Sequence, residues 1–96
     1  MFDDKRQIEA RAFYLGERLD LRAFAAERRL ATAPLVIAIG VSGCVVLFRY
    51  GVAVLFDLSA GEEQSFLTRT QQYVAEPFKQ PESETLELRL EHECVG

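Results

Sequence analysis

Apolar residues gather between positions 35 and 58, and this stretch predicts three short strands. It reads LVIAIGVSGCVVLFRYGVAVLFDL, and Arg49 and Asp57 are its only charged residues. β-Branched and aromatic side chains, which favour strands, dominate it. The segment GVSG at 40–43 and Gly51 predict turns, because glycine adopts positive φ angles without a steric cost. The expected strands are 35–39, 44–50 and 52–58.

The segment before this stretch predicts a strand and then a helix. The apolar run AFYLG at 12–16 is typical of a short strand. Asp20 can accept the free amide hydrogens of a first helical turn, and apolar residues then recur at helical spacing. This helix is expected to end near Arg29, because Pro34 disfavours helical geometry in the residue before it. Residues 1–11 are expected to form a flexible lead-in.

The segment after it predicts a second helix and a last strand. Ser59 and Glu62 form the S-x-x-E pattern of a capping box at a helix start. Pro77 is expected to end the helix, and Pro81 to keep the following connection out of regular structure. Residues 85–92 alternate between one row of leucines with His92 and one row of charges, which is typical of a half-buried strand. The helix has one apolar stripe, made of Phe66, Leu67, Thr70, Tyr73 and Val74.

These elements give the order β-α-β-β-β-α-β. The predicted fold is an α+β domain, with a mainly antiparallel sheet of about five strands and two helices packed on it. A chain of 96 residues suits one domain over positions 1–96. The strand 35–39 is almost unbroken in its apolar character, so it is expected either to be buried on both faces or to lie in the middle of the sheet. The loop at 49–51 has either two residues or three with a bulge, and the choice decides which side chains face each other.

An uncharged run from Leu30 to Phe48 is long enough to cross a bilayer as a helix. Pro34 and the two glycines of GVSG interrupt it, however, and its β-branched residues favour a hairpin. The first ten residues, MFDDKRQIEA, lack the apolar core of a signal peptide. The two cysteines make no disulfide framework. The expectation is therefore a cytoplasmic chain without a membrane span.

The net charge is −4 and the pI is about 5.0, which argues against a nucleic-acid-binding surface. The charge is uneven, since residues 1–49 hold eight Lys or Arg and six Asp or Glu, whereas residues 50–96 hold three and nine. The two halves therefore carry +2 and −6. This asymmetry would allow two copies, or a partner, to meet through opposite charges. The alternative is that both sets of charges belong to solvated faces.

No catalytic constellation is predicted, because nucleophilic catalysis needs a base beside the nucleophile and the chain has one histidine. His92 and Cys94 would point the same way on a strand, but a zinc site needs further ligands. No glycine-rich phosphate loop is present. The sequence therefore predicts neither a metal site nor a cofactor.

Four residues are candidates for contacting a partner or ligand. Arg49 and Tyr50 lie beside the turn at Gly51, where they could hold an anion or a partner's carboxylate. Alternatively, Tyr50 packs over the end of the sheet and Arg49 pairs with a nearby acid. Glu63 lies beside Glu62, either as one of two paired carboxylates or as a stabilising charge in the first helical turn. His92 ends the last predicted strand. The candidates are Arg49, Tyr50, Glu63 and His92.

Three segments, AFYLGERLDL, ATAPL and CVVLFRYGVAVLFDLSAGEEQSFL, resemble one protein family. It is the family named after "required for meiotic nuclear division" proteins, which has bacterial members and mitochondrial relatives. The resemblance covers positions 12–67, and the portion Leu-Phe-Arg-Tyr-Gly-Val is its most specific part. For longer members, the resemblance implies a globular N-terminal part that is followed by helical segments and a membrane anchor. The mitochondrial members are linked to organelle translation as scaffolds.

This resemblance implies a non-catalytic role for a bacterial member, as either the N-terminal portion of a longer domain or a short relative. An N-terminal portion would expose apolar sheet surface and favour self-association. The favoured hypothesis is a self-associating or partner-binding scaffold module, with contacts at a sheet edge and the Arg49–Tyr50 tip. The alternative is a small-molecule-binding or enzyme domain whose site a second subunit completes.

Overall fold

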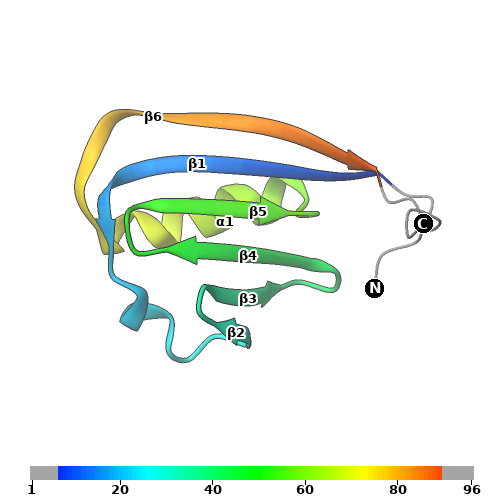
Figure 1. The fold of residues 1–96 in the computed structure, drawn as a ribbon, viewed down its shortest axis with the longest axis horizontal. Coiled ribbons are helices and arrows are strands. Elements are labelled where there is room, and N and C mark those ends of the chain that lie inside the picture. The colour runs from blue at the N-terminus through cyan, green and yellow to red at the C-terminus, as the bar shows by residue number, and fades with distance from the viewer. Residues whose placement is uncertain (1–6, 90–96) are drawn as a thin grey trace.

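The computed structural model describes residues 7–89, which form one six-stranded antiparallel sheet with one helix on a single face (Figure 1). The strand order is β2-β3-β4-β5-β1-β6. The elements are β1 (Gln7–Leu19), the 3-10 helix η1 (Leu21–Phe24), β2 (Arg29–Thr32), β3 (Leu35–Ile39), β4 (Gly43–Phe48), β5 (Val52–Phe56), α1 (Ala60–Thr70), the 3-10 helix η2 (Gln71–Tyr73) and β6 (Val74–Arg89). The prediction of five strands and two helices is therefore wrong.

The three central strands are confirmed. β3, β4 and β5 occupy the apolar stretch and pair in sequence as two hairpins. Phe48 pairs with Val52, so the second hairpin has a three-residue loop, and Gly51 in that loop has a φ of +89°. This loop length sets the register of the hairpin and so decides which residues pair on each face.

The helix predicted from Asp20 to Arg29 is wrong. The Asp20 carboxylate does accept the Arg22 amide hydrogen at 3.1 Å, but it caps only the short η1. This bond and the Arg22 guanidinium lower the pKa of Asp20, chiefly through the side-chain hydrogen bond. Phe24 is drawn into the core, and Arg29 begins β2, which pairs with β3. Strand pairing therefore overrides local helical spacing here.

The predicted end of the second helix and the predicted start of the last strand also differ from the structure. The capping box of Ser59 and Glu62 is confirmed, but α1 ends at Thr70 and β6 then runs through both Pro77 and Pro81. Because β6 is an edge strand, its outward amide groups need no partner and prolines are tolerated. Pro77 pairs with Gly16, after a shift of register in the β1–β6 ladder.

β1 is longer than the predicted strand 12–16. It pairs with β6 from Gln7 onward, so residues 7–11 belong to the sheet rather than to a lead-in. Residues 85–89 of the predicted last strand form the end of β6, whereas His92 and Cys94 lie outside the described residues.

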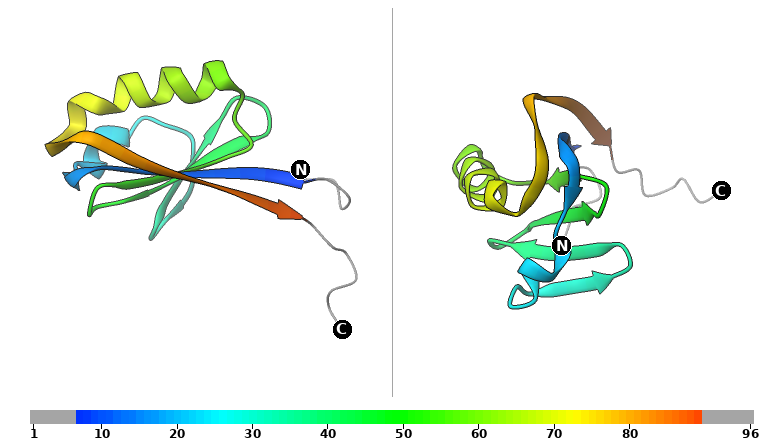
Figure 2. Two further views of the ribbon diagram at one scale, coloured as in Figure 1. Left: turned by 90° about the horizontal axis from the view of Figure 1, so that it is seen from above. Right: turned by 90° about the vertical axis from the view of Figure 1, so that its left-hand side faces the viewer.

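The hydrophobic core lies between the sheet and the two elements η1 and α1, which cover the same face (Figure 2). Phe24 from η1 and Phe66 from α1 stack with their ring centroids 6.2 Å apart. Tyr73 meets Phe24 edge-on at 5.5 Å. The buried residues of this core are Phe13, Leu19, Phe24, Leu35, Ile37, Val45, Leu47, Ala53, Leu55 and Phe66.

Candidate interaction surface

The opposite face of the sheet is also apolar, and we call it the open face. Because side chains alternate along a strand, the residues between the core residues point to this second side. All of them are partly exposed except Ala10, which pairs with Phe56 and is buried. Besides buried Ala10, the open face consists of Ala12, Tyr14, Val36, Ala38, Cys44, Val46, Phe48, Val52, Val54 and Phe56.

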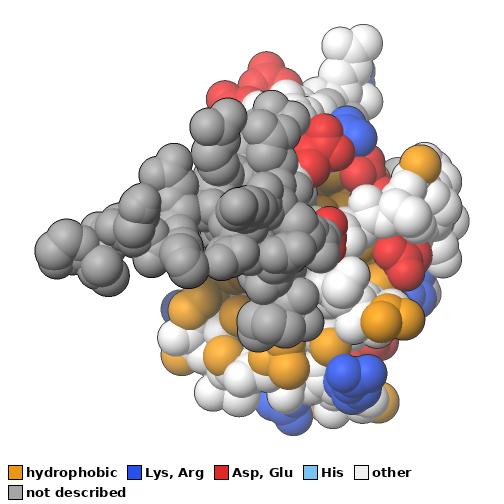
Figure 3. Space-filling view, turned by 90° about the vertical axis from the view of Figure 1, so that its right-hand side faces the viewer, with side chains coloured by type: hydrophobic (Ala, Val, Ile, Leu, Met, Phe, Trp, Pro, Cys, Tyr) orange, Lys and Arg blue, Asp and Glu red, His pale blue; other side chains and the backbone are white. Residues whose placement is uncertain are grey.

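The strand register aligns these side chains in rows across the sheet. In the middle row, Val36 pairs with Val46, Val46 with Val54, and Val54 with Ala12. Within residues 7–89, both η1 and α1 lie on the other face, so no described helix covers this surface (Figure 1). Hydrophobic side chains also gather in the lower part of the surface seen from the end of the sheet (Figure 3). Of the two alternatives predicted for 35–39, burial on both faces is wrong, whereas β3 does lie inside the sheet, between β2 and β4.

Charges of opposite sign flank the open face. Glu84 pairs with Ala12 and Glu82 with Tyr14, so these two exposed carboxylates lie on the open face of β6. At the other edge, the Arg28 carbonyl accepts the Ala38 amide hydrogen at 2.9 Å, which places exposed Arg28 beside β3. Within the described residues, none of these three side chains takes part in an ion pair. The surface is thus apolar in the middle, acidic at one edge and basic at the other.

The predicted tip residues extend this surface at one end. The Tyr50 ring stacks on Phe48 with centroids 5.2 Å apart, and 64% of Tyr50 is exposed. The Arg49 carbonyl accepts the Leu19 amide hydrogen at 2.9 Å, which ties the tip to β1. Tyr50 therefore packs on Phe48, as the second interpretation predicted, and still presents an aromatic surface. The ion pair predicted for Arg49 with a nearby acid is not found among the described residues.

Glu63 lies apart from the tip, on the helix that covers the core. Its carboxylate is 2.7 Å from an Arg11 guanidinium nitrogen, and its side chain is 15% exposed. The Arg11 guanidinium also lies over the Phe13 ring, 5.2 Å from the centroid. The structure gives Glu63 a contact between α1 and β1 and does not bring it together with Arg49 and Tyr50. His92, the fourth candidate, lies outside residues 7–89.

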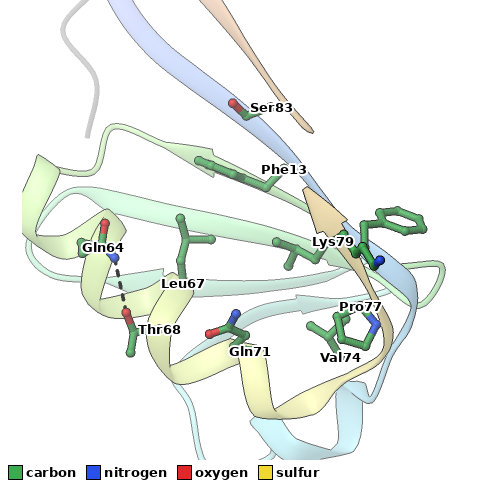
Figure 4. Close-up of a pocket in the computed structure, with 11 residues that line it drawn as sticks. Phe13, Gln64, Leu67, Thr68, Gln71, Val74, Pro77, Lys79 and Ser83 are labelled. Atoms are coloured by element: carbon green, nitrogen blue, oxygen red, sulfur yellow. Dashed lines mark hydrogen bonds between the residues drawn. The ribbon is translucent and has the colours of Figure 1, made fainter. Parts of the chain in front are cut away.

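A cavity of about 350 Å³ opens between α1, β1 and the first half of β6 (Figure 4). Apolar side chains from all three elements line it, among them Phe13, Leu67 and Val74. Gln64 and Thr68, joined by a 3.4 Å hydrogen bond, lie on its helix side, and Lys79 is the only cation among the described residues of the lining. Sequence reasoning missed this cavity because the segment between the second helix and residue 85 was predicted to lack regular structure.

Chemically reactive groups are sparse. In the part of the chain that the structure describes, no three His, Cys, Asp or Glu side chains group as metal ligands would. Burial, and after it the negative charge of Asp57, raises the pKa of the Cys44 thiol, so this group is neutral and unreactive near pH 7. Residues 7–89 thus present two apolar surfaces, the open face and the lining of the cavity beside α1.

Among residues 7–89, no helix has both the length and the apolar character needed to cross a bilayer. No protein-family model, curated protein or solved structure matches the chain. The resemblance to the meiotic-nuclear-division family therefore stays a prediction.

Proposed function

We propose that this chain is a non-catalytic interaction module that associates with a second copy of itself through the open face. The observation that carries the proposal is the continuous row of valines at positions 36, 46 and 54, extended to the aromatic rings of Phe48 and Tyr50. Contiguous exposed apolar patches on soluble domains mark interaction sites. The uneven charge of the chain supports a like partner, because each copy carries both an acidic and a basic edge.

The area of the open face sets the expected strength of the association between two copies. The four strands β3, β4, β5 and β1, about 4.8 Å apart and about five residues long, span roughly 300 Å² in projection. Stable interfaces bury about 800 Å² on each partner. The association is therefore expected to be weak and to depend on concentration.

The test is the solution mass of the purified chain, measured by light scattering over a concentration series. The proposal predicts that the average mass of the wild type rises from that of a monomer to that of a dimer as the concentration increases. Val54→Asp should abolish the rise, because it places a charge at the centre of the open face. Val41→Asp is the matched control, since Val41 is fully exposed in the loop between β3 and β4.

Circular dichroism would show whether Val54→Asp still folds. If it does not, Val54→Thr keeps the branched shape, adds a hydroxyl to the same surface and should weaken association without unfolding. A wild type that remains monomeric at every concentration would overturn the proposal, and so would equal dimerisation of folded Val54→Asp.

The cavity supports a second candidate, the binding of a small apolar molecule with one acidic group. Its floor is apolar, and Lys79 supplies the positive charge that a carboxylate would meet. Titration with a medium-chain fatty acid should raise the melting temperature of the wild type, and Lys79→Met should reduce that shift. A shift that is unchanged in Lys79→Met, or absent in the wild type, would count against this candidate.

A further inference from the structure

We infer that the two copies pack with their strands aligned, so that β6 of one copy lies over β2 of the other. This inference rests on the proposed self-association and specifies its geometry. The occupant of each open face is then the open face of a second copy, in a two-layer sandwich whose sheets are about 10 Å apart.

Symmetry leaves two simple ways to pack these faces. The sheet order places three strands on each side of the gap between β4 and β5. A two-fold axis along the strands at this gap exchanges the edges, so that β3 faces β1 and β2 faces β6. An axis across the strands instead places each strand over its own copy, with β6 over β6.

Charge selects the first arrangement. With the axis across the strands, Glu82 and Glu84 of the two copies share one edge of the interface, where like charges repel. With the axis along the strands, these carboxylates meet the edge that carries Arg28. Because the contact is two-fold, the favourable pairing occurs twice.

The positions of Arg28 and Glu84 along the strand direction allow this pairing. Glu84 lies in the row of Ala12 and Val36, and Arg28 lies opposite Ala38, two residues along β3. A two-fold axis along the strands does not change the position of a residue along the strand direction. Arg28 of one copy and Glu84 of the other therefore differ by about 7 Å in that direction. A flexible arginine side chain can span that difference.

The same operation gives compatible packing at the centre. Val46 of one copy faces Val54 of the other, because the two residues are paired in the sheet and share one height. Phe48 likewise faces Val52, and Phe56 faces Cys44. Each phenylalanine of β4 and β5 thus meets a smaller side chain, which suits interdigitation between two sheets.

Neighbouring arginines provide a matched test of the arrangement. Arg28 lies on the open face, whereas Arg29 pairs with the core residue Ile37 and so points to the covered face. At low salt, Arg28→Glu should weaken dimerisation about fivefold or more, because like charges then oppose each other at both edges. Arg29→Glu makes the same change of charge and should alter the dissociation constant by less than about twofold.

Charge exchange completes the experiment. Glu84→Lys alone should weaken dimerisation as Arg28→Glu does. An equimolar mixture of the two variants should recover the wild-type dissociation constant, because both edges of the mixed dimer then pair opposite charges. Sedimentation velocity at low and high salt would measure both constants. Failure of the mixture to recover, in a wild type that dimerises, would overturn the aligned arrangement and leave the proposed function standing.

Cross-linking gives a second readout that does not depend on charge. In chains carrying Cys44→Ala and Cys94→Ser, Arg28→Cys and Glu84→Cys variants would be mixed and treated with a short bismaleimide. The aligned arrangement predicts efficient links between the two different variants. Links between two Glu84→Cys chains would show the crossed arrangement instead, and a monomeric wild type would refute the proposed function itself.

Discussion

The carbonyl oxygen of Gly16 lies so close to Gly51 that a Cβ atom at this position would clash with it. This contact joins the bulged part of β1 to the hairpin tip between β4 and β5. Two backbone hydrogen bonds hold it, from the Leu15 amide to the Gly51 carbonyl at 2.8 Å and from the Leu19 amide to the Arg49 carbonyl at 2.9 Å. The tip that carries Tyr50 is therefore part of the rigid sheet.

Gly51→Ala should destabilise the chain by about 2–3 kcal/mol, because a side chain at Gly51 meets both this carbonyl and an unfavourable positive φ. Chemical denaturation would measure the loss. Gly61→Ala is the control, since nothing lies within 4 Å of a Cβ at that helical position. It should leave stability unchanged or raise it by up to about 1 kcal/mol. Equal effects at both positions would contradict the close approach.

Glu63→Gln should destabilise the fold, because it leaves the half-buried Arg11 guanidinium without its counter-charge. A double-mutant cycle with Arg11→Met should give a coupling energy of about 0.5–1 kcal/mol, reduced by salt. The exposed pair of Asp20 and Arg22 provides a comparison for which we expect weaker coupling. Coupling below detection in low salt would show that the Glu63 contact does not hold α1 on β1.

Thr70→Val should raise the free energy of unfolding by up to about 1 kcal/mol. Thr70 is fully buried, and its hydroxyl oxygen has no hydrogen-bond partner among the described residues. Valine has the same branched shape without the cost of burying a hydroxyl. Thr68→Val, on the exposed side of α1, should change stability by less than about 0.5 kcal/mol. A loss of stability in Thr70→Val would indicate that the hydroxyl is bonded, for example to water.

The thiol of Cys44 should make the fold less stable as pH rises. Burial raises its pKa in the folded chain, so the unfolded chain loses its proton first. The stabilising contribution is fully present below the unfolded pKa and is lost as pH rises through the folded pKa. Denaturation of Cys94→Ser between pH 7 and pH 10 should show a steeper alkaline decline than that of Cys44→Ala/Cys94→Ser. Identical slopes would contradict the raised pKa.

Local signals were sufficient for the middle of the chain. β-Branched residues, Gly51 and the Ser59–Glu62 pair predicted the hairpins and the start of α1, because each acts on its own neighbours. They failed at η1, where Phe24 packs on Phe66, and at β6, where an edge position tolerates Pro77. Both outcomes depend on contacts with distant residues, which local spacing does not encode.

The candidate site was predictable only in part. The Arg49–Tyr50 tip was identified from its turn, and the structure places it at the end of the open face. The open face was not identified, because an unbroken apolar strand looks the same in sequence whether its own chain or another molecule covers it. The acidic edge of the open face was also missed, because Glu84 was predicted to lie in a connection rather than in a strand.

The prolines of β6 have a consequence for how far an assembly of this protein can grow. A bare strand edge is a template on which further chains can add, and such growth has no natural end. Pro77 and Pro81 offer no amide hydrogen for an added strand, and the register shift at Gly16 breaks the line of that edge. The opposite edge, β2, is only four residues long and also bulged. Edge-to-edge addition of further chains is thereby disfavoured at both β6 and β2. Concentrated solutions of this protein are therefore expected to form no fibrils.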